Sequence, residues 1–229
     1  MIVEARVPDE TPYNPLDVEH LGESVTDALL GRDAVPLANL APFNGAGVYA
    51  IYYTGAAVSF APYEPLARWN RAEPYSRPIY VGKAVPSGAR KGLRSANAVG
   101  PKLHGRLVEH AESVAQATNL DLADFHCRYL VVEDIWIPLG ESLLIERFQP
   151  LWNVVVDGFG NHDPGRGRVQ GQRSMWDTLH PGRPWAAKLA NNKRPEEDTI
   201  RLIGGALAGD YVEQLPLEVR LTEADSDEQ

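Results

Sequence analysis

The chain has 229 residues, of which 44% are hydrophobic and 23% are charged, a balance that is ordinary for a globular protein. No apolar run approaches the roughly 20 residues that a bilayer span requires, and the N-terminus lacks the basic start and apolar core of a secretory signal. The single cysteine, Cys127, excludes a disulfide framework and a multi-cysteine zinc site. These features predict a cytoplasmic protein without a membrane partner.

The net charge of −9 is unevenly distributed. Residues 1–33 hold eight acids and two bases, and residues 210–229 hold seven acids and one base. Residues 34–209 therefore carry 19 bases against 16 acids, and the stretch from Arg77 to Arg106 has seven bases and no acid. A local positive face suffices to neutralise phosphates. The distribution keeps nucleic acid as a candidate partner, with a merely solvated basic face as the plainer alternative.

The first 40 residues predict an irregular arm followed by a helix. Residues 1–14 have no periodic apolar pattern, whereas Asn14-Pro15 supplies a cap and a first helical position. Apolar residues then recur every three or four positions as far as Gly31, which can end the helix. We expect residues 1–40 to form an extension of the main domain.

Two strands are predicted around a long insertion. Residues 47–54 are β-branched and aromatic, which favours a strand. Residues 78–82 predict a second short strand that ends at Gly82. The intervening residues 55–78 contain Gly, several Pro and mixed polarity, so we expect an insertion with little regular structure.

The second half predicts helices around a third strand. Residues 125–132 favour that strand, and residues 138–148 and 174–190 favour helices. Residues 101–118 predict a helix with one apolar face, formed by Leu103, Leu107, Ala111, Val114 and Ala115. The order of elements predicts an α+β fold with a small antiparallel three-stranded sheet flanked by helices. We expect the main domain to span residues 41–190 and a C-terminal extension with an acidic tail to span residues 191–229.

Five segments carry residue types suited to phosphate chemistry. They are Gly47-Val48-Tyr49, Tyr80-Val81-Gly82 with Lys83, Arg106 with His110, Glu141, and Pro150-Leu151-Trp152-Asn153. Each residue alone has a plainer interpretation. The tyrosines can be core aromatics, Arg106 and His110 can be an exposed helix pair, and any acid early in a helix gains from the dipole.

The order of these segments resembles the signature of the GIY-YIG nuclease superfamily, with Val in place of Ile in both tripeptides. Tyr80 follows Tyr49 by 31 positions, where the minimal module has a short hairpin. The type II restriction enzyme branch accommodates such an insertion. Further segments resemble the enzymes of that branch that cut CCGCGG, namely residues 45–49, 79–86, 119–122, 155–162 and 180–183.

The resemblance implies roles for the two tyrosines and the histidine. Tyr49 would take a proton from the attacking water with the help of His110, and Tyr80 would orient the water or the phosphate. An unperturbed tyrosine has a pKa of about 10 and is a poor base at neutral pH without such help. The choice of Tyr49 over Tyr80 as the base rests on the resemblance alone.

The same resemblance implies roles for four further residues. Arg106 would offer its planar fork to phosphate oxygens, and Lys83 would add positive charge. Asn153 would hold the site together by hydrogen bonds. Glu141 would bind one Mg²⁺, with Mn²⁺ as a possible substitute, because Mg²⁺ needs few protein ligands. Glu146 is a rival acid on the same helix, but it lies too far along for the pattern.

Double-stranded DNA is the expected partner. Five basic residues in loops could follow its backbone, namely Arg90, Lys91, Arg94, Arg166 and Arg168. A palindromic target implies a two-fold homodimer, although a tetramer stays open, and a restriction enzyme implies a cognate DNA methyltransferase. Two alternatives also stay open: a repair or mobile-element nuclease of the same superfamily, and a binding module without catalysis.

Overall fold

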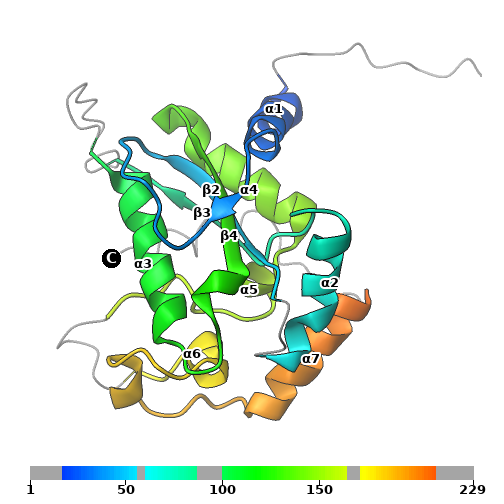
Figure 1. The fold of residues 1–229 in the computed structure, drawn as a ribbon, viewed down its shortest axis with the longest axis vertical. Coiled ribbons are helices and arrows are strands. Elements are labelled where there is room, and N and C mark those ends of the chain that lie inside the picture. Colours follow the sequence, from blue (N-terminus) through cyan, green and yellow to red (C-terminus); the bar gives the residue numbers. More distant parts are fainter. Residues whose placement is uncertain (1–16, 56–59, 87–99, 164–170, 210–229) are drawn as a thin grey trace, which may run out of the picture.

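The computed structural model describes residues 17–55, 60–86, 100–163 and 171–209. Within these residues, seven α-helices surround a four-stranded antiparallel sheet (Figure 1). The α+β architecture is as predicted, but the prediction of three strands is wrong. The added strand β1 (Val35–Pro36) pairs with β4 (Phe125–Val131) at the sheet edge. It was missed because two residues cannot show an alternating pattern, and the proline suits an edge strand.

The sheet order β1-β4-β2-β3 places β2 (Gly47–Tyr53) in the interior and β3 (Tyr80–Ala84) at an edge. All residues of β2 are buried, and their side chains alternate between the two faces. Tyr49 and Ile51 belong to one apolar cluster, whereas Val48 and Ala50 belong to another. The sheet is therefore covered on both faces.

Helices form the two covering layers (Figure 1). Helices α1 (Val18–Leu30) and α4 (Ile137–Phe148) contact each other and pack on the face of Val48. Helices α3 (Lys102–Gln116), α5 (Leu151–Val154) and α6 (Met175–Leu179) contribute to the opposite cluster, and α7 (Glu196–Ala208) packs on α6.

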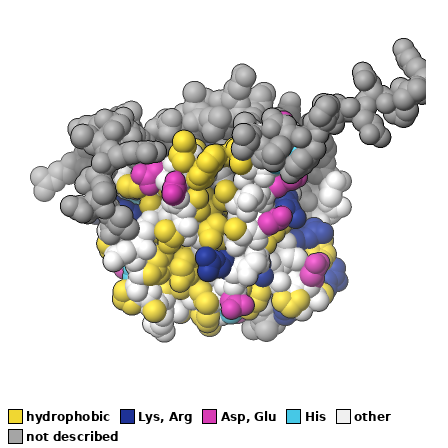
Figure 2. Space-filling view, turned by 90° about the horizontal axis from the view of Figure 1, so that it is seen from above, with side chains coloured by type: hydrophobic (Ala, Val, Ile, Leu, Met, Phe, Trp, Pro, Cys, Tyr) yellow, Lys and Arg dark blue, Asp and Glu magenta, His cyan; other side chains and the backbone are white. Residues whose placement is uncertain are grey.

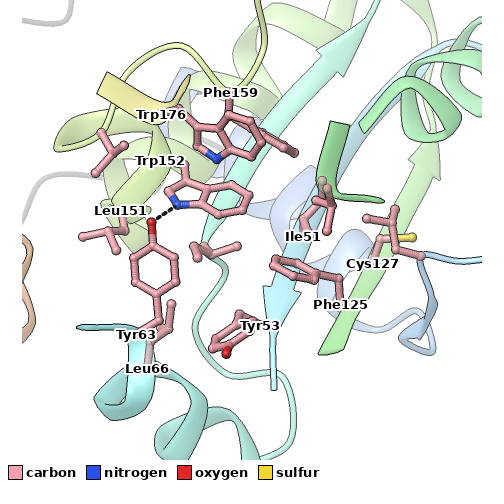
Figure 3. Packing of buried hydrophobic residues seen from close by; sticks show 14 of the residues in the cluster. Ile51, Tyr53, Tyr63, Leu66, Phe125, Cys127, Leu151, Trp152, Phe159 and Trp176 are labelled. Carbon is pink, nitrogen blue, oxygen red and sulfur yellow. Dashed lines mark hydrogen bonds between the residues drawn. The ribbon is translucent and has the colours of Figure 1, made fainter. Parts of the chain in front are cut away.

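Aromatic side chains fill the cluster on the α3 face (Figure 3). The rings of Trp152 and Phe159 lie 4.4 Å apart, and the ring of Trp176 lies 5.7 Å from Trp152. The indole N–H of Trp152 donates a hydrogen bond of 2.8 Å to the Tyr63 hydroxyl.

Hydrophobic and charged side chains are mixed on the molecular surface seen in Figure 2. Val131 and Ile135 are among the few large apolar side chains exposed in the described residues.

Three other predictions are wrong in detail. The insertion contains η1 (Ala61–Tyr63) and α2 (Glu64–Ala72), because its prolines stand in the first turns, where no N–H is needed. Strand β3 continues past Gly82 to Ala84. Residues 174–190 form α6 and the short turn η6 (Ala186–Lys188) rather than one helix, because prolines at 181 and 184 interrupt the helical hydrogen bonding.

The N-terminal helix ends as predicted, and Gly31 donates its amide to the Asp27 carbonyl at 2.9 Å. The helix packs closely on α4. A Cβ added to Gly22 would lie 1.5 Å from a Leu143 methyl group, so any larger residue there would displace the Leu143 side chain. The proposed start at Asn14-Pro15 lies outside the described residues.

The packing of α4 on the sheet predicts a contrast between two leucines. Leu144 is fully buried, whereas Leu202 on α7 is 45% exposed. Leu144→Ala should lower the free energy of unfolding by about 2–5 kcal/mol, since it leaves a cavity. Leu202→Ala should change it by less than about 0.5 kcal/mol. Urea denaturation measures both, and equal losses would contradict this arrangement.

Candidate active site

Four of the predicted residues meet on the α3 face of the sheet. Tyr49 comes from β2, Tyr80 from β3, and Arg106 and His110 from α3. The Tyr49 hydroxyl lies 2.6 Å from His110 Nε2 and shares a hydrogen bond with it. The ring centroid of Tyr80 lies 6.2 Å from that of Tyr49 and 5.2 Å from that of His110. Residues that are far apart in the sequence therefore form one polar cluster.

The strand register explains why the two tyrosines share a face. Tyr49 pairs with Gly82, and Ile51 pairs with Tyr80, so Tyr80 lies two residues along on the same side. A Cβ on Gly82 would lie 2.4 Å from the Tyr49 hydroxyl oxygen. The Tyr49 side chain thus occupies the space that the glycine leaves open.

The buried face of α3 positions the histidine. Leu103, Leu107, His110 and Val114 are buried, whereas Ala115 is exposed, so the predicted apolar face is wrong at Ala115. The His110 ring stacks on Phe159, with centroids 4.5 Å apart and an angle of 17°. Packing by apolar neighbours holds the imidazole against Tyr49.

Burial dominates the electrostatics of this cluster. It raises the pKa of Tyr49 well above its usual value, with a further rise from Tyr80 and an opposing effect of Arg106. It raises the pKa of Tyr80 to about 12, again against the effect of Arg106. Burial and the nearby Arg106 lower the pKa of His110 well below its usual value. Near neutral pH, both hydroxyls keep their protons and the imidazole is uncharged.

Arg106 is held by groups that follow α5 in the chain. Its guanidinium donates a hydrogen bond of 2.9 Å to the Gly160 carbonyl and contacts His162 Nε2. It also lies 3.2 Å from Glu109. A Cβ on Gly160 would lie 2.9 Å from the Tyr80 hydroxyl. No role was predicted for Gly160 and His162, although residues 155–162 carry part of the resemblance.

Lys83 and Glu141 form an ion pair at the edge of the sheet. Lys83 Nζ lies 3.0 Å from Glu141 Oε2, and the two side chains are 14% and 15% exposed. Lys83 pairs with Val48 in the register, so its side chain leaves the sheet on the α4 face, opposite Tyr49. The negative charge of Glu141 nevertheless raises the pKa of Tyr49 and Tyr80 on the other face. Its effect on each pKa is smaller than that of burial.

Asn153 closes the outer edge of β3. Its side-chain carbonyl accepts a hydrogen bond from the Val81 amide, and its side-chain amide donates one to the Val81 carbonyl, both at 2.8 Å. The Trp152 amide donates to the Ile79 carbonyl at 2.8 Å. An edge strand otherwise leaves such groups unpaired. Asn153 thus pairs both backbone groups of Val81 at the outer side of the strand.

A cleft of about 820 Å³ lies beside Arg106. Its lining includes the basic residues Lys83, Lys102 and Arg106 and the acidic residues Glu109 and Asp163, together with His162 and Trp185. Lys102 was not singled out in the sequence because a lone lysine carries no pattern. The five basic residues that were expected to bind DNA lie outside the described residues.

A second buried tyrosine–histidine pair lies deeper in the core. The Tyr63 hydroxyl is 2.8 Å from His180 Nε2, and His180 Nδ1 is 3.0 Å from the Asn119 side-chain oxygen. Burial, with an added effect of the Arg183 charge, lowers the pKa of His180 to about 3. His180 is fully buried, so this pair contributes to folding rather than to the cleft.

A GIY-YIG nuclease is the class of protein that this fold and this cluster define. Residues 41–205 match the family described as the Eco29kI GIY-YIG domain. The match covers more than half of the chain, so the chain belongs to this restriction endonuclease family. The domain of this family is a nuclease that acts on DNA. No curated protein matches the chain. Among the described helices, none is long and apolar enough to cross a membrane.

The buried His180 predicts a pH dependence of stability. Its pKa is about 3 in the folded protein and about 6.5 in the unfolded chain, so only the unfolded chain binds a proton between these values. Its contribution is therefore complete above about pH 6.5 and is lost as the pH falls toward 3, at about 1.4 kcal/mol per pH unit. Urea denaturation at pH 7, 6 and 5 should show a smaller loss for His180→Gln than for the wild type. Identical losses would contradict the prediction.

Proposed function

We propose that this protein is a type II restriction endonuclease that hydrolyses phosphodiester bonds of double-stranded DNA at a palindromic site. The hydrogen bond between Tyr49 and His110, next to the Arg106 guanidinium and the cleft that it lines, is the observation that carries this proposal. It joins a proton donor, a neutral proton acceptor and a phosphate-binding cation in one place. These are groups that phosphodiester hydrolysis requires.

Tyr49 is the proposed general base, with His110 as its proton acceptor. The raised pKa of Tyr49 means that the hydroxyl does not ionise by itself at neutral pH. The lowered pKa of His110 leaves an uncharged imidazole, whose Nε2 can accept the Tyr49 hydrogen bond in one of the two tautomers. Because both pKa shifts oppose ionisation of the pair, Tyr49 is proposed to take a proton from water in the same step in which it passes its own proton to His110. Tyr80 is partly exposed and is proposed to orient the water or the phosphate.

Arg106 is proposed to bind the scissile phosphate. Its guanidinium carries a permanent positive charge, and its planar fork matches two phosphate oxygens. Glu109 and His162, which now contact one of its nitrogens, would give way to such oxygens. Lys83 and Lys102 line the same cleft and would attract the DNA backbone.

Glu141 is the proposed ligand of one Mg²⁺, with Mn²⁺ as a substitute. The described residues contain no group of three or more His, Cys, Asp or Glu that could hold a metal ion. A single carboxylate fits Mg²⁺, which keeps several waters and takes further oxygens from substrate phosphates. When bound, the ion would stabilise the developing charge on the phosphate and the leaving oxygen. Lys83, which pairs with Glu141 Oε2, would have to move if that oxygen bound the ion.

CCGCGG is the proposed target, and it rests on the resemblance of residues 45–49, 79–86, 119–122, 155–162 and 180–183 to enzymes that cut it. A palindrome requires the same site on both strands, so we propose a homodimer with one active site per strand. A cognate methyltransferase that protects the cell's own sites completes the proposed system, and the cytoplasm is the proposed compartment.

The proposal predicts metal-dependent cleavage that depends on Glu141. A plasmid with one CCGCGG site should be cut once in Mg²⁺ and not in EDTA. Glu141→Ala should abolish cutting while leaving DNA binding largely intact, because the carboxylate holds the ion and not the DNA. Glu146→Ala is the matched control, since Glu146 lies on the same helix, is exposed and should be dispensable.

Each outcome of this experiment is informative. Specific cutting at another sequence would keep the nuclease and discard the target. Cutting of branched or damaged DNA without sequence preference would favour a repair enzyme. Full activity of Glu141→Ala would show that the metal ligand is misassigned, and binding without any cutting would leave a binding module.

A further inference from the structure

Arg183 is a buried arginine to which the proposed mechanism gives no role. Its side chain is only 2% exposed and pairs with Asp177, with Nε 2.7 Å from the carboxylate. The two terminal nitrogens donate three further hydrogen bonds, all to backbone carbonyls. These carbonyls belong to Gly158, Phe159 and Asn161, at 2.8, 3.1 and 3.0 Å. One side chain therefore holds almost every carbonyl of a four-residue turn.

The turn at residues 158–161 is the segment that touches the catalytic cluster. Phe159 stacks on His110, and its ring centroid lies 4.9 Å from that of Tyr80. The carbonyl of Gly160, the one that Arg183 does not hold, accepts the hydrogen bond from Arg106. The turn thus has two sides, one held by Arg183 and the other in contact with the reacting groups.

Asp177 fixes the position of the arginine in turn. Its second carboxylate oxygen lies 2.7 Å from the Ser174 hydroxyl, which caps α6 and lies 3.0 Å from the Asp177 amide. The guanidinium also lies over the rings of Trp176 and Trp185, at 4.3 and 4.9 Å. The arginine is therefore held at its Nε and also contacts two indole rings.

A contribution to stability does not by itself explain this arrangement. A buried ion pair contributes little net stability, because the desolvation of both charges offsets their attraction. Here the bonds from the two terminal nitrogens of Arg183 are all directed at one turn, and only a planar fork can reach three carbonyls and a carboxylate at once. A lysine would keep the charge near Asp177 but would lose most of these bonds.

We propose that Arg183 is a positioning residue that acts through the turn at residues 158–161 to align Arg106 and His110 for catalysis. The proposal rests on the proposed nuclease function. It predicts that release of the turn misplaces the Arg106 guanidinium and removes the stacking partner of His110. It also gives a role to the segment at residues 180–183, which the sequence singled out only by resemblance.

The test compares Arg183→Lys with a variant that loses buried hydrogen bonds elsewhere. Asn70→Ala is the matched control, because Asn70 is buried and holds Tyr53 and Arg77 through three hydrogen bonds of 2.8–3.0 Å. For each variant, the thermal unfolding midpoint, the DNA dissociation constant in Ca²⁺ and the single-turnover rate in Mg²⁺ are measured well below the unfolding transition. Asp177→Asn, which keeps the shape of the carboxylate, replaces Arg183→Lys if the latter does not fold.

We expect Arg183→Lys to lose roughly 100-fold in the single-turnover rate, the scale of a misplacement of about 1 Å, with little change in the dissociation constant. Asn70→Ala should lose stability but keep its rate. A rate for Arg183→Lys close to that of the wild type would overturn the proposal. So would an equal rate loss in Asn70→Ala at the same stability.

An NMR readout separates this inference from the proposed function. The imidazole signals of His110 should shift in Arg183→Lys and not in Asn70→Ala, because only the first variant releases Phe159 from the ring. This measurement needs no DNA and no metal. If the wild type cuts no DNA, the nuclease proposal fails, and the His110 signals still decide whether Arg183 holds the turn. Unchanged signals in Arg183→Lys would overturn the proposal.

Discussion

The hydrogen bond between Tyr49 and His110 is the interaction on which the rest of the site depends. A tyrosine and a histidine meet at 2.6 Å in the interior only because three separate elements leave room for them. Gly82 gives space to the Tyr49 side chain, α3 turns His110 toward the sheet, and Phe159 covers the imidazole. Apolar packing thus sets a polar contact, and the lack of water around it shifts the pKa of both groups away from ionisation.

The edge strand β3 lies between this buried contact and the Lys83–Glu141 ion pair. One face of the strand carries Tyr80 toward the tyrosine–histidine pair, and the other carries Lys83 toward Glu141 on α4. Asn153 hydrogen-bonds both backbone groups of Val81 at the outer side of the strand. A further strand therefore cannot pair with β3 at this residue. In the proposed mechanism, a base, a cation and a carboxylate would act from two faces of one sheet on a single phosphate.

Much of the fold and the central cluster could be predicted from the sequence, because the signals are local. The aromatic strand at Tyr49, the short strand at Tyr80 and the helix with Arg106 and His110 each have a clear pattern, and their order supplied the resemblance. Strand β1 and helix α2 were missed, since one is too short and the other is hidden among prolines. Arg183 received no role because its contacts depend on a turn more than 20 residues away in the sequence, which no local pattern records.

A comparison of Tyr49→Phe with Tyr80→Phe tests the central claim most directly. Both changes keep the ring and remove one hydroxyl, so the fold should survive in each. Single-turnover cleavage in Mg²⁺ should fall by roughly 100-fold or more for Tyr49→Phe, the usual contribution of a general base, with DNA binding retained. Cleavage by Tyr49→Phe at the wild-type rate, with a large loss in Tyr80→Phe, would contradict the account and place the base on Tyr80.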